Sequence, residues 1–254
     1  MIDRVLESMF HWYRLVGRAS DGARVLELDG IVAAVVPAAP ERAVVNAVLF
    51  RSAAQLQAAY DEIASAYREI GAKWTVWVPP GEDGDAAGRF LEGRGHVLDA
   101  QPVAMLHDLK GLQPPSHPRS ISDGRVDEVG QVNDQAYTFG TDSFSRALQT
   151  LPDGAVHIYV FRQDGRPVGC MTTADHEGNT EVQMVAVVPE ARGRGIAGDL
   201  LRQALGDAAE RGSETASLVA TKMGSPVYER EGFRALGQLS MWERRTASLA
   251  GGAA

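Results

Sequence analysis

The sequence predicts an α/β (α+β) fold made of two similar units, each a mixed, mostly antiparallel sheet flanked by helices. Short strand-like segments alternate with helical segments along the chain. The order of segments in residues 23–109 recurs in residues 155–245, and a stretch rich in proline and serine, residues 111–120, separates the two copies. We therefore expect one unit at 1–112, a linker at 113–120, a second unit at 121–247 and a disordered tail at 248–254.

The first half begins with an amphipathic helix, expected over residues 1–19, in which charges interrupt the apolar residues every few positions. Apolar runs predict the strands that follow, and apolar residues three and four apart predict the helices. The strands are expected at 23–30, 30–38, 42–50, 73–80 and 101–109, and the helices at 53–72 and 86–96.

The second half repeats this order after early helices within 126–144. Asp164 and Gly165 form a hairpin signal between two strand-like segments, and Gly212 is a suitable stop for the long helix before it. The strands are expected at 155–162, 166–175, 179–189, 215–221 and 238–245, and the helices at 196–212 and 225–232.

Four pairs of residues have nearly the same spacing between the halves. At offsets of 139, 139, 141 and 137 residues, they are Gly30 with Gly169, Val48 with Val187, Val78 with Val219, and Gly95 with Gly232. A nearly constant offset through two strand–helix units indicates an internal duplication. Chance similarity between two α/β halves is the alternative.

Composition narrows the class of protein. The 254 residues carry a net charge of −8 and a single cysteine, Cys170. The acidic balance gives no sign of a surface for nucleic acid, and one cysteine excludes an internal disulfide. No apolar stretch is long enough to cross a membrane. We expect a cytoplasmic protein that binds neither nucleic acid nor membranes, and no metal, because the six histidines show no paired ligand spacing.

Residues 189–201, with the sequence PEARGRGIAGDLL, join an apolar strand to an amphipathic helix. Gly193 and Gly195 allow a ligand to approach the backbone closely. The first turn of the helix offers unpaired N–H groups at the positive end of its dipole, and Arg192 and Arg194 add positive charge. This combination predicts a site for a pyrophosphate group.

The same residues spell GxGxxG, the fingerprint of dinucleotide-binding folds. That site needs a strand running directly into the first glycine and a carboxylate at the end of the next strand. Here residues 189–192 precede Gly193, and the next strand ends in Thr221 and Lys222. The sequence therefore argues against an oxidoreductase of this type.

Arg192, Gly195 and Ala197 fit the pattern Q/R-x-x-G-x-G/A, and with the strand before and the helix after they resemble the signature of the GNAT superfamily of acyl-coenzyme-A-dependent N-acyltransferases. The resemblance covers about residues 120–245. It implies that acetyl-CoA is bound by backbone groups along the pantetheine arm and at the pyrophosphate. These are in Val185, Ala186 and Val187 for the arm, and in Gly193, Arg194, Gly195, Ile196, Ala197 and Gly198 for the pyrophosphate, with Arg192 beside them.

At the 139-residue offset the first half has Ala53 in place of Arg192 and Leu56 in place of Gly195. We therefore expect two fused GNAT-like units, of which the N-terminal one is a degenerate copy without a coenzyme site. It would serve as structure or as one wall of the acceptor pocket.

The departing thiolate of coenzyme A needs a proton. Relatives commonly carry a tyrosine ahead of a Gly-Phe pair, and Tyr228 ahead of Gly232 and Phe233 fits this spacing. The resemblance thus implies Tyr228 as the general acid; an aromatic ring that only packs on the sheet is the alternative. Many relatives have asparagine at the position of Thr221, which we include among the coenzyme contacts although a hydroxyl replaces only part of an amide.

The general base is less clearly marked. Glu181, early on the strand that leads to the loop, and Glu214, at the start of the next strand, can each take a proton from an amine directly or through water. Either can instead be a charge at a strand end, and many relatives use only water and backbone groups, so the absence of a dedicated base is a further alternative. Of the two, Glu181 is the stronger candidate. Cys170 lies on a predicted core strand, so we expect it to be buried and not nucleophilic.

These residues predict direct transfer of an acetyl or other short acyl group from acetyl-CoA to the amine of a small molecule or a peptide. The acceptor is expected between residues 126–144 and the last strands, where Tyr137, Asp142 and Trp242 are candidate contacts. A non-catalytic module that binds acyl-CoA is the alternative function. The sequence leaves open whether the chain forms a homodimer.

Overall fold

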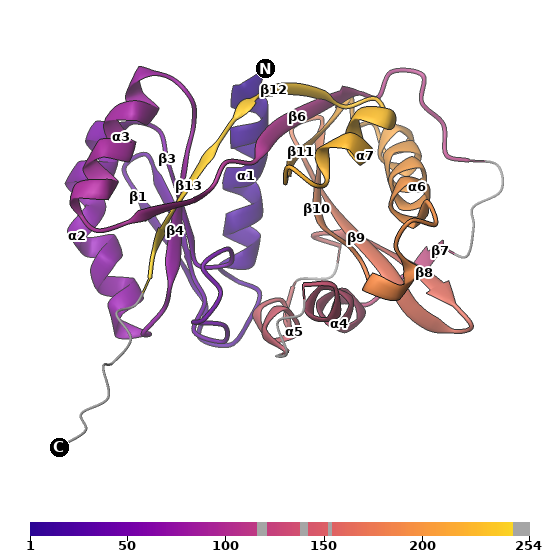
Figure 1. Ribbon diagram of the computed structural model, residues 1–254, viewed down its shortest axis with the longest axis horizontal. Coiled ribbons are helices and arrows are strands. Elements are labelled where there is room, and N and C mark those ends of the chain that lie inside the picture. Colours follow the sequence, from indigo (N-terminus) through magenta and orange to yellow (C-terminus); the bar gives the residue numbers. More distant parts are fainter. Residues whose placement is uncertain (116–120, 138–141, 152–153, 246–254) are drawn as a thin grey trace.

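The computed structural model describes residues 1–115, 121–137, 142–151 and 154–245, which form two mixed sheets with helices between and around them (Figure 1). The first sheet has the order β1-β2-β3-β4-β13-β5 and the second the order β12-β6-β11-β10-β9-β8-β7. The strands are β1 (Arg24–Leu28), β2 (Ile31–Val35), β3 (Ala47–Phe50), β4 (Trp74–Val78), β5 (Val97–Ala100), β6 (Val103–Asp108), β7 (Ile121–Asp123), β8 (His157–Gln163), β9 (Arg166–His176), β10 (Asn179–Val187), β11 (Thr215–Ala220), β12 (Arg234–Gln238) and β13 (Ser240–Arg244). The helices are α1 (Ile2–Val16), α2 (Ala53–Glu69), α3 (Glu82–Gly93), α4 (Val126–Ala136), α5 (Ser143–Ala147), the 3-10 turn η1 (Pro189–Ala191), α6 (Ile196–Glu210) and α7 (Ser225–Arg230).

Apart from β7, the two sheets have the same succession of strand directions. Three antiparallel strands lead to a parallel pair, β3 with β4 in one sheet and β10 with β11 in the other. Two further antiparallel strands complete each sheet. Val48 and Val187, which share the 139-residue offset, lie on the corresponding strands β3 and β10. From the first strand to the parallel pair, the repeated order expected from the sequence therefore falls on corresponding strands of the two sheets.

Each sheet contains one strand from the other half of the sequence. Strand β6 lies between β11 and β12 of the second sheet, and β13 lies between β4 and β5 of the first. The two crossing segments run side by side, because the Leu239 amide donates to the Pro102 carbonyl at 2.9 Å. The expected division at residues 113–120 did not anticipate this exchange, since it assigned 101–109 to the first unit and 238–245 to the second.

Helix α1 lies between the two sheets, while α2 and α3 cover the outer face of the first sheet and α6 covers the outer face of the second (Figure 1). One apolar core joins α1 to both sheets, with Leu49 of β3 and Ala174 of β9 among its members. Helix α4 packs on the same inner face of the second sheet as α1. Within the described residues, no helix is both long and apolar enough to cross a membrane.

Candidate active site

The second sheet opens between its two parallel strands. Strands β10 and β11 pair only through residues 179–181 and 215–217. Beyond that point β10 follows β9, whereas β11 follows β6. The Val188 amide donates to the Val168 carbonyl of β9 at 3.0 Å. Because successive amides of a strand point to opposite edges, the Val187 amide points into the opening.

The turn before α6 presents a row of free amides beside this opening. Gly193 and Gly195 have φ angles of 75° and 79°, a left-handed conformation that glycine adopts without steric cost. Within the described residues none of the amides of 193–198 has an acceptor, and the first that bonds is Asp199, to the Gly195 carbonyl at 3.0 Å. A Cβ at Gly193 or Gly195 would meet no atom within 4 Å. Free donors at the positive end of a 15-residue helix fit an anionic diphosphate.

The two arginines of the turn are engaged by the protein itself. Arg192 donates through Nε to the Val187 carbonyl at 3.1 Å and through Nη2 to the Ala136 carbonyl, at the end of α4, at 2.6 Å. Arg194 donates to the Gln163 side chain at 3.1 Å and to the Glu190 carbonyl at 3.0 Å. Arg192 thus ties the turn to β10 and α4, a positioning role that the sequence analysis did not foresee.

The end of α2 that corresponds to this turn is closed by side chains. Ser52 Oγ accepts from the Gln55 amide at 3.3 Å, and Asp83 Oδ2 accepts from the Ala53 amide at 2.9 Å. A carboxylate of the chain therefore lies where an external anion would have to bind.

Tyr228 lies on α7, half-buried, with its ring edge-on to Phe233 at 6.0 Å between centroids. Burial raises the pKa of the Tyr228 phenol far above its ordinary value, and nearby Tyr137 raises it further. The phenol is therefore protonated at neutral pH. Thr221 follows β11, and its Oγ1 accepts from the Gly224 amide at 3.2 Å, which shapes the turn into α7.

Glu181 is the last residue of β10 that pairs with β11, and it is 1% exposed. Its Oε1 accepts from Gln183 Nε2 at 2.7 Å, whereas its Oε2 is buried without a hydrogen-bond partner among the described residues. Burial raises the pKa of Glu181 to about 8, against the opposing effect of the Gln183 bond. Its charge also contributes, after burial, to the raised pKa of Tyr13 on α1, so Glu181 faces the inner side of the sheet.

Of the expected acceptor contacts, Tyr137 lies near the opening, because it follows Ala136, whose carbonyl accepts from Arg192 of the turn, and it is 45% exposed. Trp242 does not lie there. It belongs to β13 in the first sheet, and its ring lies against Gly88 of α3. The expectation failed because β13 leaves the second sheet. Asp142 precedes α5 and pairs with Arg146.

Of the two remaining candidates, Glu214 lies apart from the opening, and Cys170 is buried and unreactive. Glu214 is exposed at the amino end of β11, the end opposite to Thr221. Cys170 is fully buried, and burial raises the pKa of its thiol. The structure thus brings Val187, the 193–198 turn, Tyr137 and Tyr228 of α7 near one another, and it separates Glu214 and Trp242 from them. Among the described residues, no group of three or more His, Cys, Asp or Glu side chains is placed to hold a metal ion.

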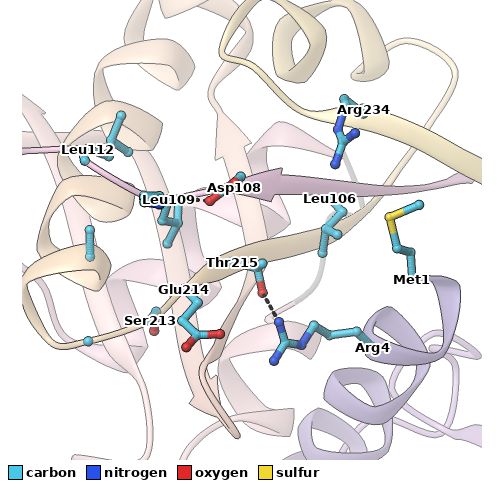
Figure 2. A pocket seen from close by; sticks show the side chains of 14 residues that line it. Met1, Arg4, Leu106, Asp108, Leu109, Leu112, Ser213, Glu214, Thr215 and Arg234 are labelled. Carbon is cyan, nitrogen blue, oxygen red and sulfur yellow. Dashed lines mark hydrogen bonds between the residues drawn. The ribbon is translucent and has the colours of Figure 1, made fainter.

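A cavity of about 740 Å³ lies at the amino end of β11, away from the opening (Figure 2). Arg4 of α1 reaches into this region and donates to Thr215 Oγ1 at 3.3 Å. Asp108 and Glu214 line it together with Arg4 and Arg234, so charges of both signs are mixed there. This cavity is therefore not part of the candidate active site.

The second sheet thus opens between two parallel strands, and a glycine turn leads from the opening into a helix whose first amides are free among the described residues. Residues 127–241 match the family model for the acetyltransferase (GNAT) domain.

Solved structures give the same result for the fold. A GCN5-related N-acetyltransferase from Kribbella flavida has a TM-score of 0.66 and 16% identity, with 97% of both chains covered. A functionally unknown conserved protein from Staphylococcus epidermidis has a TM-score of 0.63 and 15% identity, with 89% of this chain and 95% of that chain covered. A GCN5-related N-acetyltransferase from Sphaerobacter thermophilus has a TM-score of 0.57 and 19% identity, with 88% and 82% covered. No curated protein matches the chain.

We expect Glu181→Gln to become more stabilising as the pH rises. The folded carboxyl titrates near 8 and an unfolded one near 4.5, so wild-type stability is lost as the pH rises from 4.5 toward 8. One unit of pKa shift corresponds to about 1.4 kcal/mol, so between pH 5 and 8.5 the variant should gain roughly 4 kcal/mol over wild type. Denaturant unfolding of both proteins at the two pH values measures this gain. A stability difference that does not change with pH would show that the carboxyl is hydrated.

Proposed function

We propose that this chain transfers an acetyl group, or another short acyl group, from acetyl-CoA to an amine acceptor. The observation that carries the proposal is the row of free amides at 193–198 next to the open edge of β10. When bound, acetyl-CoA would supply a reactive thioester and an anionic diphosphate. The amides of the turn would hold the diphosphate, and the Val185 and Val187 backbone would hold the pantetheine arm and polarise the thioester carbonyl.

Direct transfer fits the residues around the opening. Cys170 is the only cysteine of the chain, and its burial and raised pKa keep the thiol protonated and out of reach. Tyr228, whose phenol is protonated at neutral pH, would give its proton to the departing thiolate. The protein's contribution is then to orient the two substrates and to move protons.

Glu181 would serve as the general base. Its pKa of about 8 makes the carboxylate a better proton acceptor than an exposed glutamate, and its Oε2, which has no hydrogen-bond partner in the described part of the chain, leaves one oxygen for a proton. Because the side chain is 1% exposed, the proton would reach it through a water molecule. We place the acceptor amine, of a small molecule or a peptide, on this inner side, where α1 forms part of the wall.

We further propose that the two sheets represent a tandem duplication whose N-terminal copy has lost its coenzyme site. The shared strand directions and the closed end of α2 support this. In this proposal Asp83 and Ser52 replace the missing anion, so the first unit can fold without a ligand.

We expect Arg192→Ala combined with Gly195→Leu to abolish acetyl-CoA binding without unfolding the protein. The first substitution removes the hydrogen bond from Arg192 to the Val187 carbonyl, and the second places a side chain at a residue with a left-handed conformation. Loss of two or three bonds to a charged ligand corresponds to a loss of affinity of about 100-fold or more. Calorimetry with acetyl-CoA measures it. Asp83→Ala at the end of α2 is the matched control and should leave the affinity unchanged. Full affinity in the double variant would place the coenzyme elsewhere.

We expect Tyr228→Phe to lower kcat by roughly 100-fold or more while leaving the dissociation constant of acetyl-CoA unchanged, because only the proton donor is removed. Phenylalanine keeps the packing against Phe233. Thiol release with a panel of amines measures kcat. Tyr159→Phe, on β8, removes the same atom outside the opening and should retain activity. No thiol release by the wild type with any amine would favour the non-catalytic module, and a fully active Tyr228→Phe would exclude the phenol as the acid.

We expect kcat/KM of the wild type to rise with pH, with the midpoint of the rise near pH 8, because Glu181 must be ionised to act as a base. Glu181→Gln should lower the rate and flatten this rise. The measurement uses an acceptor amine whose pKa lies below about 6, so that the substrate does not titrate in the same pH range as Glu181. An unchanged rise in the variant would assign the titration to another group.

A further inference from the structure

We propose that Asn133 of α4 is a positioning residue for the coenzyme-facing edge of β10, because it holds the β-bulge that turns the Val185 and Val187 amides into the opening. This inference rests on the proposed function and adds to it a residue on the helix opposite the coenzyme turn.

The bulge is visible in the pairing of β10 with β9. Gln183 pairs with Thr172 and Ala186 pairs with Cys170, so β10 has one residue more than β9 between these two pairs. Met184 has a φ of 55°, in the left-handed region that residues other than glycine seldom adopt. The bulge therefore needs a partner that keeps Met184 in this conformation.

Asn133 is that partner. Its side chain is 2% exposed, and its Nδ2 lies 3.2 Å from the Met184 carbonyl oxygen. The same nitrogen lies 2.9 Å from the Val129 carbonyl oxygen one turn earlier on α4, which fixes the direction of the amide group. The thiol of Cys170 fills the remaining space, with Sγ 3.2 Å from Asn133 Nδ2 and 3.4 Å from the Met184 carbonyl oxygen.

The bulge decides which backbone groups face the opening. The Val188 amide points to β9, so the Val187 amide, and the Val185 amide two residues earlier, point the other way. One inserted residue shifts the alternation along a strand by one position. Without the bulge, the neighbouring amides would face the opening, and they would be displaced along the strand. Asn133 therefore acts on coenzyme binding through β10, without touching the coenzyme.

The experiment compares Asn133→Leu, which keeps the approximate volume and removes the donor, with the wild type. Acetyl-CoA affinity should fall about 10-fold, the effect of one buried hydrogen bond, while the far-ultraviolet circular dichroism is retained. Hydrogen exchange at the Val187 amide should change in the protein without coenzyme. Val132→Ala, the neighbouring buried residue on α4, is the control and should lower stability without lowering affinity. Asn133→Ser, too short to reach the Met184 carbonyl, should reproduce the loss of affinity if Asn133→Leu fails to fold.

A second substitution separates positioning from general stability. Met184→Gly in the Asn133→Leu background should restore affinity without restoring the melting temperature, because glycine adopts the left-handed conformation unaided. Met184→Ala in the same background should not restore it. Wild-type protein that does not bind acetyl-CoA would overturn the proposed function and this inference together. Wild-type protein that binds, with unchanged affinity and Val187 exchange in both Asn133 variants, would overturn the role of Asn133 alone.

Discussion

Strand β10 leaves β11 after three paired residues, and the other features of the site depend on this separation. A parallel ladder that ends inside a sheet leaves backbone donors and acceptors that must find partners. On the β10 side, Arg192 donates a hydrogen bond to the Val187 carbonyl. The Val187 amide faces the opening. Next to it, the turn before α6 leaves its own amides free. In the proposed function, the same unpaired backbone that would be a cost in a closed sheet is what would hold the coenzyme.

In the second half, the glycine turn and the long helix could be predicted from the sequence because both depend on neighbouring residues. Gly193 and Gly195 adopt the left-handed conformation that their position before a helix indicated, and the residues 193–198 have the free amides that the resemblance implied. The long helices α2 and α6 also follow from periodicity, because each buries one apolar stripe. Strand β13 lies within the expected range 238–245, whereas β12 was not expected from the sequence. Strand β5 was missed because Val97 and Leu98 are exposed and give no burial signal.

Contacts between residues that are distant in the sequence could not be predicted in the same way. Trp242 lies on a strand as expected, but the identity of its neighbours depends on a crossing between sheets that no local pattern encodes. Arg192 was expected to face a phosphate, and it instead binds two carbonyls, one of them at the end of a helix 56 residues earlier in the chain. Asn133 gave only a weak signal, a polar residue on the apolar face of α4, because its partner Met184 is distant in sequence.

The exchange of β6 and β13 makes the two halves of the molecule inseparable by a simple cut. A break in the backbone after Leu112 would leave each fragment with a strand embedded in the other's sheet, since β6 precedes that point and β13 follows it. The fragments would remain one particle, held by four hydrogen-bonded strand ladders and not by the covalent link. Neither half can therefore complete its own sheet alone, and loss of either strand separates the edge strand from the rest of the sheet in the opposite half.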